Sequence, residues 1–398
     1  MRFLIISDIH CVSRELSKLN GGYHGSTGSD FFIEERSSTK NPIFAIEAAL
    51  KDANMQVDAI LCLGDFAHQS KQLPFLQVWR DIHDLAAVLD VKEVYGITGN
   101  HDILSRAEDV QDASVRLDFL KSVRPAFPHS NDAFRADYFQ DGVASAELGD
   151  CCLIAIDTCR AHGLGGDAEQ TKGIWEVGLV TADMQEKILR IASESEKDHI
   201  LVIMHHHPIK VDELEDIYPD AMEDGAQFLK ALGDTGKKCL LVHGHKHQVH
   251  LKITELGTAY SPIVFSAATF SARPYPTQIN GFYNLFHIID FDTSETTFPA
   301  GEIFSWSWSG TSWVKSKHDL MPFHVPFGRE VDVIALAKEL AELNLPATGT
   351  LRAEALFDEC QNLKFFRITE LEALNKELAP HGRVILPLNS KIHAMMEI

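Results

Sequence analysis

The feature that most constrains the fold is a series of short apolar runs, each of which opens into polar or glycine residues. The runs are residues 3–6, 59–63, 94–97, 152–156, 200–204, 239–242 and 262–265. Continuous apolar runs of this length are typical of strands that are buried on both faces. Helical patterns lie between several of them, at 43–51, 75–89 and 184–192. This alternation predicts an α/β core.

The pattern changes after about residue 258. Residues 282–291 and 303–308 show partial period-two alternation, which indicates antiparallel strands. We therefore expect two packed sheets flanked by helices in a domain at 1–295, followed by a strand-rich connection at 296–326. Residues 12–42 contain a glycine-rich stretch that predicts a mobile loop insertion.

Residues 327–398 are expected to form a small α/β appendage. An amphipathic helix is predicted at 331–343, a capping-box pattern at 369–372 predicts the start of another, and a strand-like run follows at 384–386. The apolar helix face allows either packing on the core or self-association into a homo-oligomer. Packing on the core is the default expectation.

Composition argues against several classes of function. The 398 residues include 57 Asp and Glu against 36 Lys and Arg, a formal net charge of −21. That field repels nucleic-acid backbones and anionic membranes, and no apolar stretch is long enough to span a bilayer. The seven cysteines include no C-x-x-C pair and lie mostly in or beside apolar runs. Buried reduced thiols of this kind predict a cytoplasmic location.

Polar side chains of the metal-binding type follow five of the predicted strands. These segments are Asp8-Ile9-His10, Gly64-Asp65, Gly99-Asn100-His101-Asp102, His205-His206-His207 and Gly244-His245-Lys246-His247. Ligands in open α/β sheets bind beyond the carboxyl ends of the strands. Each motif alone is common by chance, but chance does not explain all five in order, each at a strand end. The sequence therefore predicts that these ends share one site.

The spacing suits such a site. In extended chain, residues i and i+2 point the same way, so Asp8 can reach the site with His10, and His245 with His247. The Asp65 carboxylate has two oxygens and can bridge two ions. The preceding glycines permit close backbone approach.

Seven residues are thus candidate metal ligands, and the choice between His205 and His206 stays open on this reasoning. The candidates are Asp8, His10, Asp65, Asn100, His205, His245 and His247. Their donors are nitrogen and oxygen, without thiolate. This set is typical of catalytic rather than structural sites and fits Mn, Fe, Co, Ni or Zn.

The order of these motifs resembles that of calcineurin-like metallophosphoesterases, whose signature is D-x-H, G-D, G-N-H-[D/E], H and G-H-x-H. The resemblance covers roughly residues 1–295. It implies a four-layer sandwich of two mixed sheets flanked by helices, with two divalent metal ions. One ion would be bound by Asp8, His10, Asp65 and His247, and the other by Asp65, Asn100, His205 and His245. His101 would be the catalytic histidine and Asp102 the acid that orients it.

The activity implied is hydrolysis of a phosphate ester by in-line attack of a hydroxide that bridges the two metals. Within the superfamily, the segments 204–208 and 244–248 look most like class III cyclic-nucleotide phosphodiesterases, which favours a phosphodiester or small nucleotide as substrate. Two alternatives remain. One is a manganese-dependent DNA nuclease of the repair type, which the acidic charge disfavours. The other is a non-catalytic scaffold of the retromer-subunit type, which the intact ligand set opposes.

Overall fold

Two mixed β-sheets form the body of the protein in the computed structural model, which describes residues 1–15, 28–29, 31–105, 115–162, 177–210, 221–258, 260–273, 283–388 and 390–398. The first sheet has the order β12-β11-β10-β1-β2-β3, and β13 also pairs with β11. Its strands are β1 (Arg2–Ile6), β2 (Ala59–Cys62), β3 (Glu93–Gly96), β10 (Leu285–Phe291), β11 (Gly301–Trp308), β12 (Trp313–Lys315) and β13 (His324–Phe327). β1, β2 and β3 are parallel, and β10 runs antiparallel to β1.

The second sheet has the order β4-β5-β6-β7-β9-β8. Its strands are β4 (Val143–Leu148), β5 (Cys151–Ile156), β6 (His199–Ile203), β7 (Lys238–His243), β8 (Val249–Ile253) and β9 (Ile263–Ala267). β5, β6, β7 and β9 are parallel, whereas β4 and β8 are antiparallel edges. The two sheets are therefore both mixed, as the sequence predicts.

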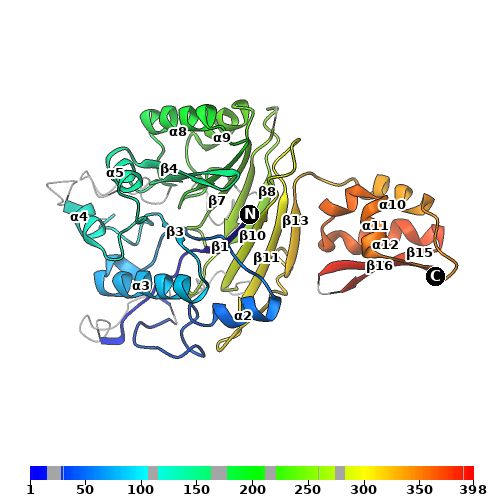
Figure 1. Cartoon of the computed structure of the whole chain (residues 1–398), viewed down its shortest axis with the longest axis horizontal. Helices are drawn as coiled ribbons and strands as arrows, with labels where there is room; N and C mark the ends of the chain where they lie inside the picture. Colours follow the sequence, from blue (N-terminus) through cyan, green and yellow to red (C-terminus); the bar gives the residue numbers. More distant parts are fainter. Residues whose placement is uncertain are drawn as a thin grey trace.

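Helices cover the two outer faces of the paired sheets. Figure 1 shows α8 and α9 on one side of the body and α2 and α3 on the other. The helices of the body are α2 (Ile46–Ala53), α3 (Gln72–Val88), α4 (Val115–Ser122), α5 (Asp132–Asp141), α8 (Ala182–Glu194) and α9 (Gly225–Asp234), with the 3₁₀ turn η1 (His68–Ser70). This arrangement confirms the predicted four-layer α/β sandwich.

Alternation along each strand explains the layers, because successive side chains point to opposite faces of a sheet. In β1, Leu4 and Ile6 pack with α2 and α3, while Phe3 and Ile5 pack between the sheets. The second sheet repeats the pattern, with one set of strand residues against α8 and α9 and the other set in the central layer. Because neither face of these strands is exposed, their sequences are apolar without interruption.

Residues 296–326 are not a connection, which corrects that expectation. β11 pairs with β10 along its whole length and with β13 from the other side, so this segment is part of the first sheet. The partial alternation in the sequence has a simple cause: Phe304 and Trp306 are buried against the helical layer, and Ile303 is buried between the sheets.

The expected mobile loop at 12–42 is corrected in part. Residues 16–27 and 30, which include most of the glycine-rich stretch, lie outside the described residues. Residues 31–42 are fixed to the body. Phe31 is buried, Arg36 makes a two-pronged ion pair with the fully buried Asp81 at 2.7 and 2.8 Å, and the Trp313 indole donates to the Pro42 carbonyl at 2.7 Å.

The C-terminal unit has its own hydrophobic core and its own small sheet, of order β14-β16-β15. Its elements are α10 (Val333–Glu342), β14 (Thr350–Arg352), α11 (Ala353–Glu359), η4 (Gln361–Phe365), η5 (Ile368–Glu370), α12 (Leu371–Leu378), η6 (Ala379–His381), β15 (Arg383–Leu388) and β16 (Lys391–Glu397). The apolar face of α10 packs inside this core through Leu336 and Leu340. A helix does form where the capping-box pattern predicted one, but the predicted cap was wrong. α12 begins after Glu370, and this N-cap residue makes no side-chain hydrogen bond.

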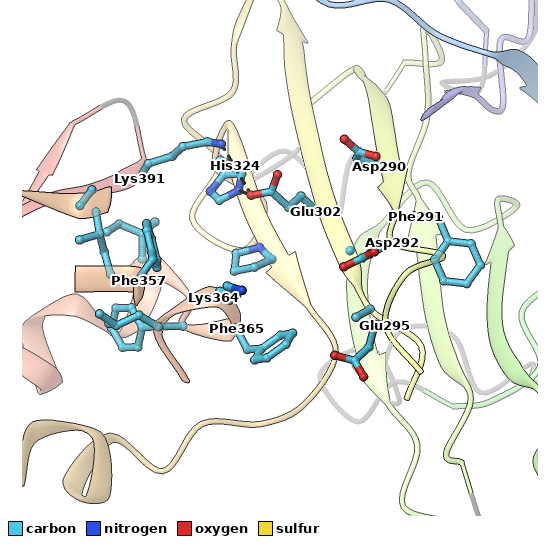
Figure 2. Close-up of a pocket in the computed structure, with 18 of the residues that line it drawn as sticks. Asp290, Phe291, Asp292, Glu295, Glu302, His324, Phe357, Lys364, Phe365 and Lys391 are labelled. Atoms are coloured by element: carbon cyan, nitrogen blue, oxygen red, sulfur yellow. Dashed lines mark hydrogen bonds and ion pairs between the residues drawn. The ribbon is translucent and has the colours of Figure 1, made fainter. Parts of the chain in front are cut away.

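A cleft of about 1010 Å³ separates this unit from the first sheet. The Glu302 carboxylate of β11 pairs with both His324 and Lys391, at 2.5 and 3.6 Å (Figure 2). The Arg329 guanidinium lies near the rings of Phe298 and Phe365. Charged and aromatic contacts therefore join the two units.

No helix among the described residues has both the length and the apolar character needed to cross a membrane.

The buried Asp81 provides a test of how firmly residues 31–42 are held. Arg36→Ala leaves this carboxylate without its cation, so the free energy of unfolding should fall by about 3 kcal/mol. Lys230→Ala, which breaks an exposed pair with Asp234 in α9, should cost less than about 1 kcal/mol. Denaturant unfolding measures both, and equal effects of the two variants would contradict the assignment.

Candidate metal centre

The carboxyl ends of five parallel strands from the two sheets meet at one place. β1, β2 and β3 lead into the loops that carry Asp8, Asp65 and Asn100, and β6 and β7 lead into those that carry His205 and His245. The structure brings together all seven residues predicted as ligands. Six are buried, namely Asp8, His10, Asp65, Asn100, His205 and His247, and His245 is half-buried.

The ligand atoms fall into a first group around His10. Its Nε2 lies 3.0 Å from Nε2 of His247 and 3.2 Å from Oδ2 of Asp65. Oδ1 of Asp8 lies 3.4 Å from Nε2 of His247. These four side chains come from three loops and face one point.

A second group surrounds the Asn100 amide oxygen. This Oδ1 lies 3.0 Å from Nε2 of His205 and 3.1 Å from Nδ1 of His245. Nε2 of His205 lies 3.5 Å from Oδ2 of Asp65. The same Asp65 oxygen therefore faces both groups, while its Oδ1 accepts the backbone N–H of His101 at 2.7 Å.

These spacings fit bound cations. Two ligands held at about 2.1 Å from one tetrahedral ion lie about 3.4 Å apart, which is close to the separations in both groups. His205 also has a defined tautomer for such a role, because its Nδ1 lies 2.7 Å from the Leu63 carbonyl and must donate to it. Nε2 of His205 is then the nitrogen that can bind a cation together with the oxygens of Asp65 and Asn100.

The backbone brings these side chains together by a route that differs from the expected extended chain. Asp8, His10, Asp65, His245 and His247 all have positive φ, between 49° and 81°. The strands have already ended, so alternation along a strand does not explain why Asp8 joins His10 or why His245 joins His247. Left-handed turns do so instead, at about 1–3 kcal/mol of strain for each residue.

Two glycines permit the close approach of these turns. A Cβ on Gly99 would lie 2.2 Å from the amide nitrogen of Asp65, and one on Gly244 would lie 2.3 Å from Oδ2 of Asp8. Any side chain at either position would displace an aspartate of the site.

The electrostatics of the cluster tie the carboxylates to the imidazoles. Burial opposes ionisation of Asp8 and Asp65, but the neighbouring histidines outweigh it and hold the pKa of both carboxyls below their usual range. Burial likewise opposes the charge of His10 and His205, yet the carboxylates raise the pKa of His10 to about 10 and that of His205 to about 9.

The structure separates the roles of the adjacent His205 and His206. His205 faces Asp65 and Asn100, as described above. Nδ1 of His206 lies instead 2.8 Å from the Thr158 hydroxyl, after β5. Of these two rings, that of His205 belongs to the cluster.

His101 is partly exposed at the cluster, and the adjacent Asp102 is buried. The Asp102 carboxylate accepts the backbone N–H groups of Asp65 and Phe66 at 2.8 Å, of Gly99 at 2.9 Å and of Ala67 at 3.3 Å. Asp102 therefore holds the loop that carries Asp65, because both of its oxygens accept backbone donors. Its expected role of orienting the His101 imidazole stays a prediction.

Sequence reasoning missed His68, which is buried in η1. Its ring stacks on that of His101, with centroids 5.3 Å apart, and lies 5.8 Å from that of His10. The sequence feature that could have pointed to His68 is its position three residues after the candidate ligand Asp65.

Comparison with known proteins identifies the family. The family model of calcineurin-like phosphoesterases matches residues 1–249, and the chain belongs to this family of metal-dependent phosphoester hydrolases. A search of curated protein sequences finds no match.

Two solved structures are similar in fold at low identity. A dimetal phosphatase from Danio rerio is 10% identical, with a TM-score of 0.48 over 79% of this chain and 98% of that chain. Purple acid phosphatase PPD1 from yellow lupin, Lupinus luteus, is also 10% identical, with a TM-score of 0.47 over 83% of this chain and 54% of that chain. At these TM-scores the likenesses carry no conclusion about substrate.

The Asp102 contacts generate a test of its role. Asp102→Asn replaces an acceptor oxygen by an N–H donor and leaves backbone donors unpaired, at about 1–3 kcal/mol each. We expect lower stability and lower metal content, measured by denaturant unfolding and elemental analysis. Asp150→Asn in the exposed β4–β5 turn should change neither. A variant with normal stability and metal content but an altered pH–rate profile would show that Asp102 acts by orienting His101.

Proposed function

We propose that the protein is a phosphoesterase with two divalent cations at the cluster described above. Asp8, His10, Asp65 and His247 would hold one, and Asp65, Asn100, His205 and His245 the other. The observation that carries this proposal is the Asp65 Oδ2 atom, which faces His10 of the first group and His205 of the second. A carboxylate in that position suits a ligand that two cations share.

The nitrogen and oxygen donors suit Mn, Fe, Co, Ni or Zn. When bound, a pair of such cations neutralises phosphoryl charge and lowers the pKa of a water so that a hydroxide nucleophile is available near neutral pH. Their positive charge also accounts for binding an anion to a chain of net charge −21.

His101 is proposed as the catalytic acid. Its Nδ1 accepts the backbone N–H of Gln69 at 3.3 Å, so the neutral ring carries its proton on Nε2. The ring is half-buried and sits beside that of His10, with centroids 4.7 Å apart. From that place Nε2 can donate its proton to a phosphoryl oxygen or to the leaving alkoxide.

A phosphodiester or small nucleotide is the proposed substrate. The support is the likeness of residues 204–208 and 244–248 to class III cyclic-nucleotide phosphodiesterases. The repair-nuclease alternative is opposed by the net charge of −21, and the scaffold alternative by the complete ligand set. All seven cysteines are free and buried, which supports a reducing, cytoplasmic location.

Two substitutions separate metal binding from proton transfer. Asp65→Ala removes the carboxylate that faces both groups, so both ions and nearly all turnover should be lost. His101→Gln should keep the metals and lower kcat by roughly 10²- to 10⁴-fold. Elemental analysis and steady-state kinetics measure the two, with His393→Gln on the exposed face of β16 as control. Turnover by Asp65→Ala, or loss of metal from His101→Gln, would contradict the roles given.

A substrate panel tests the proposed diester preference. The metal-loaded protein should have a higher kcat/KM for bis(p-nitrophenyl) phosphate and cyclic nucleotides than for p-nitrophenyl phosphate. Faster hydrolysis of the monoester would refute that preference. Degradation of DNA with manganese would favour the nuclease instead, and loss of every activity in the metal-loaded protein would favour the scaffold.

A further inference from the structure

A second cluster of metal-ligand type lies beside the proposed dinuclear centre and shares no residue with it. Cys159, His162 and His206 each offer one ligand atom, and these three atoms lie within 4.8 Å of one another. All three residues are almost completely buried. They follow the ends of β5 and β6, which are adjacent parallel strands.

A tight turn presents Cys159 and His162 together. The backbone N–H of His162 donates to the Cys159 carbonyl at 2.9 Å, and the N–H of Cys159 donates to the Asp157 carboxylate at 3.1 Å. The result is a Cys-x-x-His turn directly after β5. Short spacings of this kind recur in protein metal sites, because one turn can direct both side chains to a single ion.

The His206 ring is fixed by contacts on its other edge. Its Nδ1 is hydrogen-bonded to the Thr158 hydroxyl at 2.8 Å, and that hydroxyl also accepts the His206 backbone N–H at 3.3 Å. The ring packs so closely on Gly178 that a Cβ there would lie 2.4 Å from Cγ of His206. A histidine held in this way by an outer hydrogen-bond partner is typical of a metal ligand.

Nε2 of His206 is the atom that lacks an explanation. It is fully buried and has no hydrogen-bond partner among the described residues. Leaving such a nitrogen unpaired costs about 1–3 kcal/mol. His206 belongs to the cluster with Cys159 and His162, and a cation bound there could pair this nitrogen.

We propose that Cys159, His162 and His206 form a third metal site that binds a thiophilic ion of the Zn²⁺ class. One thiolate and two imidazoles suit tetrahedral Zn²⁺ with the fourth position open to water. The Cys159 thiol now donates to the Thr98 carbonyl at 3.3 Å, and on binding it would release that proton to solvent. The His206 and His245 rings lie 4.3 Å apart, so this site adjoins the dinuclear centre.

Cobalt titration of the full-length, metal-stripped protein tests this site apart from the dinuclear one. Only a cobalt–thiolate bond gives an intense charge-transfer absorption, which nitrogen and oxygen ligands do not produce. We expect three equivalents of Co²⁺ and this band in the wild type. Cys159→Ser should abolish the band and leave two equivalents, whereas Cys152→Ser on β5 should change nothing.

Two further variants keep the outcome interpretable. His162→Gln should weaken the affinity of the thiolate site at least roughly tenfold, which is what loss of even an outer partner of a ligand costs. If circular dichroism shows that Cys159→Ser does not fold, the affinity of His162→Gln for Co²⁺ tests the same site in its place. Asp65→Ala should lose the other two equivalents and keep the band. Absence of the band from the wild type, or its survival in a folded Cys159→Ser protein, would overturn the third site without affecting the proposed hydrolase.

Discussion

The site depends on the hydrogen bonds that the Asp102 carboxylate accepts from the backbone. Its two oxygens pair with the N–H groups of Asp65, Phe66, Ala67 and Gly99, so that one buried side chain joins the loop after β2 to the loop after β3. Hydrogen bonds are directional, so four of them that converge on one side chain fix the relative position of the two loops. They fix the backbone at Asp65, whose side chain is the one that both groups of ligand atoms share.

The strained turns around Asp65 are held by neighbouring loops. The N–H of Asp8 donates to the Gly64 carbonyl and the N–H of His10 to the Asp65 carbonyl, at 3.1 and 2.8 Å, which ties the loop after β1 to that after β2. The Thr269 hydroxyl donates to the Asp8 carbonyl from the far side. Tertiary hydrogen bonds therefore offset the positive φ of Asp8, His10 and Asp65.

The C-terminal unit and the candidate metal centre lie at opposite ends of the strands of the first sheet. The cleft beside it is lined by Met1, at the start of β1, and by Asp290 and Phe291, at the end of the antiparallel β10. The candidate metal centre follows the opposite end of β1, at Asp8. Among the described residues, the lining of this cleft includes none of the predicted ligands. The appended unit contacts the sandwich through the Glu302–Lys391 ion pair and through Arg329, which lies over the Phe298 and Phe365 rings.

The sequence by itself determined the layers and the identity of the polar residues that meet. Runs such as 200–204 are apolar on both faces, so they had to be buried strands, and ligand-type residues that follow several parallel strands had to share one edge. It did not determine how Asp8 joins His10, because left-handed turns depend on carbonyls of a loop more than fifty residues away. It also did not place residues 303–308, whose partners β10 and β13 are separate segments. Only the tertiary structure could decide that His205 faces Asp65, that Asp102 binds the backbone of two loops, and that His206 lies beside Cys159. These choices rest on contacts between distant loops, for which local pattern carries no signal.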